Sequence, residues 1–154
     1  MEKVIVIAGP TASGKTALAV ELAKRINGEV ISCDSMQIYK DMSIGTAKPT
    51  VEEMDGVPHY LIDFISPDER YSVADFKRDA EKKIEYVLNK GKVPILCGGT
   101  GLYIDTLVFG IDYPEIELDQ EYRDELMKRA ESEEGLKKLY DEAKKIDSEA
   151  MEKI

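Results

Sequence analysis

VIVIAGPTASGKTALAVELA, residues 4–23, is the stretch that decides the fold. An apolar run, VIVIAG (4–9), breaks into a loop that contains two glycines and then resumes with apolar residues at helical spacing. We expect a buried strand at 4–9 and a helix from Thr16 to Arg25, which Asn27-Gly28 ends. Strand, loop and helix in this order are the repeating unit of a parallel α/β sheet.

The loop between strand and helix matches the phosphate-binding pattern G-x-x-x-x-G-K-[ST] in the setting that the pattern needs. Its residues are Gly9, Pro10, Thr11, Ala12, Ser13, Gly14, Lys15 and Thr16. The two glycines permit a tight turn, and the loop amides and helix N-terminus direct partial positive charge at an anion. Lys15 adds a cation, and the Thr16 hydroxyl can join the shell of Mg²⁺. A phosphate chain is the expected ligand, and a glycine turn used only for packing is the weaker alternative.

The rest of the chain up to residue 111 repeats strands and helices. We expect strands at EVISCDS (29–35), HYLIDFIS (59–66) and VPILCGG (93–99), and an amphipathic helix over 72–91 capped by Ser72 and stopped by Gly91. Residues 36–50 show no clean period and predict a long loop, a kind of segment that often carries function. The fold class is therefore α/β: a P-loop NTPase-like parallel sheet flanked by helices, with right-handed connections.

Beyond Asp112 the composition shifts to Glu and Lys, with apolar residues at helical spacing. We therefore expect an incomplete core domain at 1–111 and the start of a helical insertion subdomain at 112–154. No stop signal closes the last helical segment, so we expect the polypeptide to continue beyond Ile154.

Composition excludes several classes of protein. The net charge of −10 argues against general nucleic-acid binding, although residues 1–50 are close to neutral and permit an anionic ligand. Cys33 and Cys97 lack zinc-site or disulfide spacing and predict buried thiols. No signal peptide or membrane-length apolar run is present, so we expect a cytoplasmic protein without membrane association.

Three further positions are candidates for chemistry. Asp34 and Ser35 end the second strand, at the carboxyl edge where α/β proteins place their sites, so Asp34 is either a structural cap or a base or metal ligand. Thr100, in the Gly98-Gly99-Thr100-Gly101 turn, either approaches the same site or belongs to a plain turn. His59, the lone histidine, is either a structural residue at a strand start or a ligand.

Three reaction classes fit a phosphate loop of this kind. A small-molecule or nucleotide kinase that uses ATP is the general expectation, but the chain has few arginines and no Arg-rich lid. A non-catalytic nucleotide switch lacks its Asp-x-x-Gly motif. In the third class the loop holds a diphosphate leaving group while an acid deprotonates the acceptor.

Five segments, in order, resemble the tRNA dimethylallyltransferase family, also called tRNA isopentenyltransferases. They are GPTASGKT (9–16), SCDSMQIYKDMSIGTAKP (32–49), GVPHYLID (56–63), YSVADF (71–76) and GGTGLY (98–103). The resemblance covers the chain to about residue 110 and continues more weakly beyond it. The second segment is the most specific, because general kinases lack it.

The resemblance implies transfer of a dimethylallyl group from dimethylallyl diphosphate to N6 of the adenosine beside the tRNA anticodon. It implies that the loop up to Thr16 holds the diphosphate with Mg²⁺ near Thr16, that Lys15 helps to hold the departing charge, and that Asp34 takes the N6 proton. Contacts to a flipped-out adenine in the anticodon loop would come from Asp34, Ser35, Met36 and Gln37, with Thr100 near the reacting carbon and Arg123 contacting tRNA. No protein partner is implied.

The family's members are considerably longer than this chain. We therefore predict that these 154 residues bind diphosphate but transfer the prenyl group to tRNA weakly or not at all. Adenylate isopentenyltransferase, which acts on free AMP, ADP or ATP, is the alternative within the resemblance, and a P-loop kinase is the alternative outside it.

Overall fold

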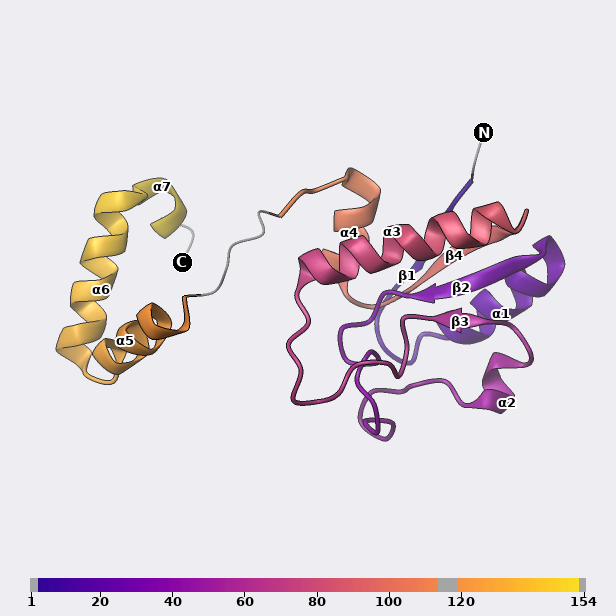
Figure 1. The fold of residues 1–154 in the computed structure, drawn as a ribbon, viewed down its shortest axis with the longest axis horizontal. Coiled ribbons are helices and arrows are strands. Elements are labelled where there is room, and N and C mark those ends of the chain that lie inside the picture. Colours follow the sequence, from indigo (N-terminus) through magenta and orange to yellow (C-terminus); the bar gives the residue numbers. More distant parts are fainter. Residues whose placement is uncertain (1–2, 114–118, 153–154) are drawn as a thin grey trace. The chain divides into compact units, whose positions relative to one another are not determined.

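A computed structural model describes residues 3–113 and 119–152 of the chain. Within these residues four parallel strands form one sheet in the order β1-β4-β2-β3. The strands are β1 (Ile5–Ala8), β2 (Gly28–Ser32), β3 (His59–Tyr60) and β4 (Val93–Gly98). The predicted P-loop NTPase-like α/β fold with a parallel sheet is confirmed. Because all strands run the same way, their carboxyl ends share one edge (Figure 1).

Helices cover both faces of the sheet. Helix α1 (Lys15–Ile26) packs on one face, and α3 (Val73–Asn89) with α4 (Gly101–Phe109) packs on the other (Figure 1). Successive side chains of a strand point to opposite faces, so neighbouring strand residues enter different cores. Neighbouring residues of β2 follow this rule, because Val30 lies in the core under α1 and Ile31 lies in the core under α3 and α4. The two cysteines are divided between the same cores, Cys97 under α1 and Cys33 under α3 and α4. Both are buried free thiols, as predicted.

The helix boundaries follow from local chemistry. Asn27 adopts the left-handed conformation (φ 55°) and ends α1. Ser72 caps α3 through a capping box with Asp75, and Gly91 (φ 68°) follows that helix in the left-handed region. The predicted stop and cap signals at these positions are confirmed.

The strand expected at 59–66 is wrong beyond its first two residues. Only His59 and Tyr60 pair with β2, because Leu61 (φ 56°) and Asp63 (φ 57°) adopt left-handed backbone that no extended strand allows. The chain turns twice there, and its next segment bonds to the loop after β2 instead of continuing the sheet. The strand expected at 29–35 likewise ends early, at Ser32, which leaves Asp34 beyond the sheet edge.

A buried carboxylate organises the opposite, amino-terminal edge of the sheet. Glu29 is fully buried and accepts hydrogen bonds from Lys90 Nζ (2.5 Å), Lys92 Nζ (2.6 Å) and the Tyr60 hydroxyl (2.7 Å). Burial raises the pKa of Glu29, but these three hydrogen bonds outweigh it, so that the pKa falls to about 2. Glu29 therefore ties together β2, β3 and the turn before β4.

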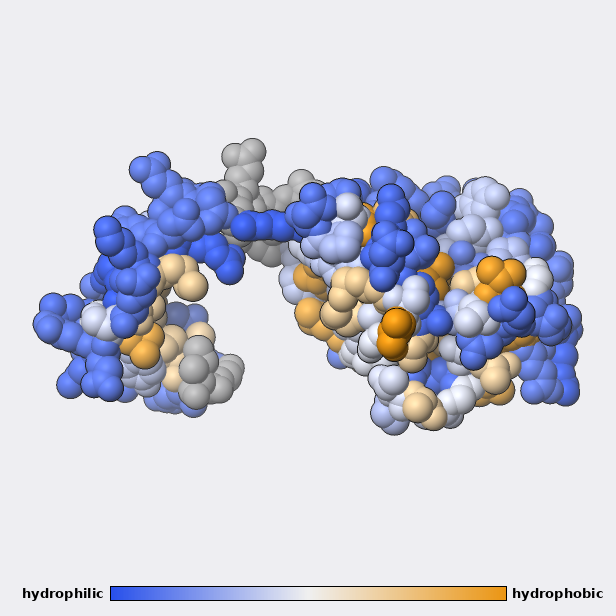
Figure 2. Space-filling model, turned by 90° about the horizontal axis from the view of Figure 1, so that it is seen from below, coloured by the Kyte–Doolittle hydropathy of each residue, from blue (hydrophilic) through white to orange (hydrophobic). Residues whose placement is uncertain are grey.

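The chain divides into two compact units, Met1–Pro114 and Glu115–Ile154. The second contains α5 (Gln120–Ala130), α6 (Glu133–Ile146) and α7 (Ser148–Met151), none of which buries a residue. Figure 2 shows hydrophilic residues over most of its visible surface, with apolar residues gathered on one side. In the first unit the short helix α2 (Val51–Met54) interrupts the long connection from β2 to β3. None of the helices in the described residues has the length and apolar character needed to cross a membrane.

Candidate functional site

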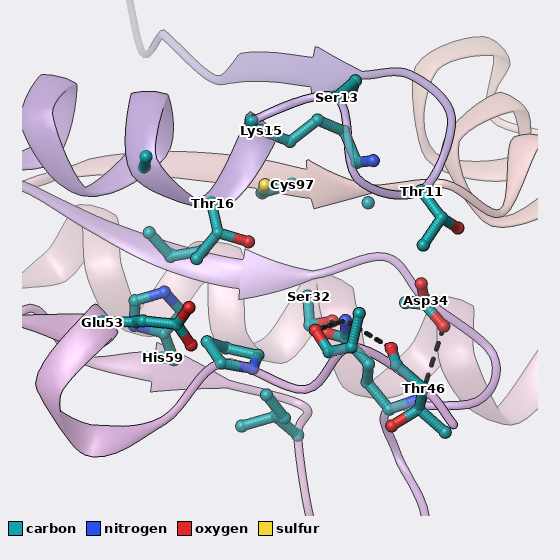
Figure 3. A pocket seen from close by; sticks show the side chains of 18 of the residues that line it. Thr11, Ser13, Lys15, Thr16, Ser32, Asp34, Thr46, Glu53, His59 and Cys97 are labelled. Atoms are coloured by element: carbon teal, nitrogen blue, oxygen red, sulfur yellow. Dashed lines mark hydrogen bonds between the residues drawn. The ribbon is translucent and has the colours of Figure 1, made fainter. Parts of the chain in front are cut away.

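A pocket of about 330 Å³ opens at the carboxyl edge of the sheet (Figure 3). The phosphate loop forms one wall, residues that follow β2 form another, and the end of β4 lies between them. Its lining comprises Thr11 to Ala17, Val30, Ser32, Asp34, Gln37, Thr46, Ala47, Pro49, Glu53, His59, Ile62, Cys97 and Gly98. Two segments that were predicted to carry chemistry, the phosphate loop and the Asp34 turn, therefore face a common cavity.

The phosphate loop is tightly turned. Ala12 (φ 62°) and Gly14 (φ 85°) both adopt left-handed backbone, and a side chain at Gly9 would contact Ser13 Oγ at 3.3 Å. The Lys15 ammonium donates a hydrogen bond to the carbonyl oxygen of Pro10 at 2.5 Å, across the loop. The cation is thus held over the loop, where a phosphate oxygen would replace or join the carbonyl as its acceptor.

The end of β4 leaves room for nothing larger than glycine. A Cβ atom at Gly98 would stand 2.1 Å from the carbonyl oxygen of Cys33. The neighbouring Cys97 thiol lies in the pocket wall, and burial raises its pKa to about 11 despite the opposing charge of Lys15. This thiol stays protonated at neutral pH and contributes a neutral surface to the pocket.

The structure gives Asp34 a structural role in its own turn and also places it in the wall of the pocket. Its Oδ1 accepts hydrogen bonds from the backbone N–H groups of Met36 (2.9 Å) and Gln37 (3.3 Å), which fixes the turn after β2. The residue is half-buried and lines the pocket, so its carboxylate also faces the cavity (Figure 3). A carboxylate held by two amides is acceptor-rich and well oriented for a proton from a bound ligand.

Thr100 reaches this turn from the neighbouring strand. Its hydroxyl oxygen accepts a hydrogen bond from the Ser35 N–H at 2.9 Å and lies 3.3 Å from Ser35 Oγ. Its own N–H donates to the Cys33 carbonyl at 3.1 Å. Thr100 is not among the residues that line the pocket, and its hydroxyl contacts the Asp34 turn at Ser35.

Gln37 anchors the long loop to the sheet. Its side-chain amide donates to the carbonyl oxygens of Thr46 (3.2 Å) and Ala47 (3.1 Å), and its Oε1 accepts from Ser32 at 3.3 Å. Residues 36–50 contain neither helix nor strand, as expected, yet these bonds fold the loop back onto the pocket. The pocket wall at 46–49 therefore depends on Gln37.

Two other residues that were predicted to contact tRNA, Met36 and Arg123, do not line this pocket. Met36 is exposed and lines a separate hollow of about 280 Å³ together with residues 41–46. Arg123 lies on α5, in the helical unit, and is exposed. Across the described residues, no group of three or more His, Cys, Asp or Glu side chains is placed to hold a metal ion. A metal at this site would therefore depend on Thr16, the ligand's oxygens and water.

Sequence reasoning missed four lining residues that come from the segment between 49 and 62. They are Pro49, Glu53, His59 and Ile62; the sequence had offered His59 as a structural residue or a ligand, but had not placed it in this pocket. Pattern alone does not show that this segment folds back under the phosphate loop, because the fold depends on left-handed residues at 61 and 63 and on the Gln37 anchor.

The family model and the curated proteins that match this chain describe the same kind of enzyme. A family model described as IPP transferase matches residues 37–154. The tRNA dimethylallyltransferase of Acetivibrio thermocellus is 55% identical over 154 residues, which is 100% of this chain and 49% of the relative. The enzyme of the same name from Thermoanaerobacter sp. is 48% identical, covering 99% of this chain and 48% of the relative. The chain thus spans about half the length of the curated relatives that it matches.

The solved structures that resemble this chain are enzymes of the same kind. The full-length tRNA isopentenylpyrophosphate transferase of Bacillus halodurans matches with a TM-score of 0.73 and 50% identity, covering 100% of this chain and 50% of that protein. A eukaryotic dimethylallyltransferase acting on tRNA matches with a TM-score of 0.79 and 35% identity, covering 100% of this chain and 38% of that protein.

Proposed function

The chain belongs to the IPP transferase family, and we propose that it holds dimethylallyl diphosphate as donor for transfer of the dimethylallyl group to tRNA. The acceptor is N6 of the adenosine beside the anticodon, and diphosphate is released. One observation carries this proposal: the phosphate loop and the Asp34 carboxylate face one another across a single pocket.

The chemistry follows from that arrangement. The bond between the allylic carbon and the diphosphate oxygen breaks, and its electron pair leaves with the diphosphate. The N6 nitrogen forms the new bond to carbon, and its proton passes to Asp34. Loop amides and Lys15 stabilise the charge that develops on the leaving group. Asp34 is positioned by the amides of Met36 and Gln37, and good hydrogen-bond geometry is what a general base needs first.

Mg²⁺ fits this pocket as a partner of the diphosphate. The Thr16 hydroxyl lines the cavity at the start of α1, and a hydroxyl at this place in a phosphate loop is a magnesium ligand. When bound, the ion would neutralise charge on the departing diphosphate. The lining also contains acceptors that suit coordinated water, among them Glu53.

We expect these 154 residues by themselves to transfer the dimethylallyl group to tRNA slowly or not at all. The relatives are about twice as long, and the charge of −10 gives this chain a poor surface for tRNA. The site residues of the first unit suffice for the donor, whereas tRNA contacts need more basic surface. We therefore propose donor binding with weak or absent transfer.

Radiolabelled dimethylallyl diphosphate, offered with Mg²⁺ to tRNA and separately to AMP, ADP and ATP, tests the proposal. Calorimetry should show binding of the donor, and any label transferred should appear in tRNA. Label in free nucleotides only would instead favour an adenylate isopentenyltransferase. Transfer of the γ-phosphate from ATP to a small acceptor would favour a kinase, and rapid labelling of tRNA by this chain would contradict the weak-transfer expectation.

A further inference from the structure

His59 lines the pocket, and one nitrogen of its ring has no hydrogen-bond partner in the structure. Its Nδ1 lies 2.9 Å from the carbonyl oxygen of Val57, and because a carbonyl can only accept, Nδ1 carries the hydrogen. Nε2 then has a free lone pair. That atom is buried and, within the described part of the chain, is the one buried side-chain nitrogen or oxygen with no hydrogen-bond partner. Native structures seldom leave such an atom unpaired, so a donor is missing.

The ring remains a neutral acceptor at physiological pH. Burial lowers the pKa of His59, and the hydrogen bond to Val57 opposes the change only in part. The missing partner therefore has to bring its own proton to Nε2, as an N–H or O–H group.

The position of His59 within the pocket narrows the choice of donor. Figure 3 shows His59 at the same end of the pocket as Thr16 and Glu53, with Thr11 and Asp34 at the other end. The adenine amino group of the proposed acceptor belongs beside Asp34, away from His59. Ionised diphosphate offers acceptor oxygens only. Water bound to a metal ion is a donor, and Mg²⁺ characteristically keeps several such waters.

Glu53 also favours metal-bound water as the ligand at this end of the pocket. Its Oε2 is held by the backbone N–H of Thr50 at 2.8 Å, in the capping box of α2, and its carboxylate lines the pocket. A second acceptor with negative charge repels a bare diphosphate and attracts a hydrated cation. His59 and Glu53 thus form a wall suited to a water shell.

We propose that His59 is a positioning residue whose Nε2 accepts a hydrogen bond from a water bound to the Mg²⁺ that accompanies the diphosphate. The inference rests on the proposed function, since it assumes that magnesium and diphosphate occupy the phosphate loop. It assigns His59 a task in orienting the metal's waters, and it leaves the proton transfer to Asp34.

Because His59 is the only histidine, nitrogen-15 NMR of histidine-labelled protein reports on it alone. We expect the free chain to show protonated Nδ1 and unprotonated Nε2. Addition of Mg²⁺ with inorganic diphosphate should shift the Nε2 resonance upfield and leave Nδ1 nearly unchanged, while diphosphate with EDTA should leave both unchanged. An Nε2 resonance that does not move while calorimetry shows binding would overturn the inference alone. Absence of Mg²⁺-diphosphate binding would overturn the proposed function and the inference with it.

Two variants of His59 distinguish the contribution of Nδ1 from that of Nε2. His59→Asn keeps a donor near the Nδ1 position for Val57 but removes the acceptor, whereas His59→Gln keeps an acceptor near the Nε2 position. We expect His59→Asn to weaken Mg²⁺-diphosphate binding by about five- to tenfold, the worth of one hydrogen bond, and His59→Gln to weaken it less. Circular dichroism melts check that both variants fold. Equal affinity of a folded His59→Asn variant and the wild type would contradict the proposal.

Discussion

The hydroxyl oxygen of Thr100 accepts a hydrogen bond from the backbone N–H of Ser35 at 2.9 Å, joining residues that lie 65 positions apart in sequence. The contact links the turn after β4 to the turn after β2 that carries Asp34. Since Asp34 is aimed by its own turn, Thr100 acts on it through Ser35.

Removing that hydroxyl should loosen the Asp34 turn. Thr100→Val keeps the size of the side chain but loses the acceptor, so we expect the free energy of unfolding to fall by about 1 kcal/mol, because the partly buried Ser35 N–H loses its partner. Thr100→Ser retains the hydroxyl and should lose less. Urea titration measures both. A Thr100→Val chain as stable as Thr100→Ser would show that the hydroxyl does not hold the turn.

Replacing Asp34 by Asn should separate its two roles. The amide oxygen of Asn can still accept from the N–H groups of Met36 and Gln37, but it cannot take a proton at neutral pH. We expect transfer in single-turnover assays to fall by about 10²- to 10⁴-fold, while Mg²⁺-diphosphate binding is kept. Asp34→Ala, which also loses the turn, should lower stability as well. Unchanged transfer by Asp34→Asn would remove it as the base.

Replacing Lys15 by Ala should weaken Mg²⁺-diphosphate binding by about ten- to a hundredfold, because a charged hydrogen bond contributes about 1.5–3 kcal/mol. The change should cost little stability, since the hydrogen bond from the Lys15 ammonium to the Pro10 carbonyl oxygen lies at the exposed surface of the loop. Lys24→Ala is the matched control, because Lys24 lies on the same helix and pairs with Asp55 outside the pocket. Calorimetry that finds equal affinity for the two variants would contradict a phosphate role for Lys15.

Glu29 should make the fold sensitive to acid. Its pKa is about 2 in the folded chain against a usual value of 4.5, so the unfolded chain binds the proton first as pH falls. The stabilisation, about 3 kcal/mol, is complete above pH 4.5 and is lost between pH 4.5 and about 2. Urea titrations at several pH values should show this loss, and Glu29→Gln should be less stable at pH 7 but less dependent on pH in that window. Glu85→Gln, an exposed change on α3, is the control and should keep the wild-type slope.

Gly98 should be irreplaceable for a steric reason. In Gly98→Ala the new Cβ would stand 2.1 Å from the carbonyl oxygen of Cys33, so β2 and β4 would have to separate. We expect a loss of about 3 kcal/mol or failure to fold. Gly101→Ala, at the start of α4, meets no atom within 4 Å and should leave stability unchanged or raised. Similar melting temperatures for the two variants would contradict the steric account.

The order of elements in the core could be predicted because it depends on local chemistry. A continuous apolar run and a glycine loop predicted β1, the phosphate loop and α1, and the caps at Ser72 and Asn27 predicted helix ends that the structure confirms. Predictions failed where backbone conformation opposed the pattern. The run HYLIDFIS reads as one strand, but left-handed backbone at Leu61 and Asp63 bends it after Tyr60.

By itself, the sequence determined that this chain has a phosphate loop on a parallel sheet, because loop geometry, strand and helix are set by neighbouring residues. Only the tertiary structure decided which distant groups share the pocket. Asp34 faces the loop because β2 lies one strand away from β1, with β4 between them. Thr100 supports the Asp34 turn through Ser35, and His59 and Glu53 enter from a segment folded back by Gln37. These placements depend on strand order and on hydrogen bonds between residues far apart in sequence, which no local pattern encodes.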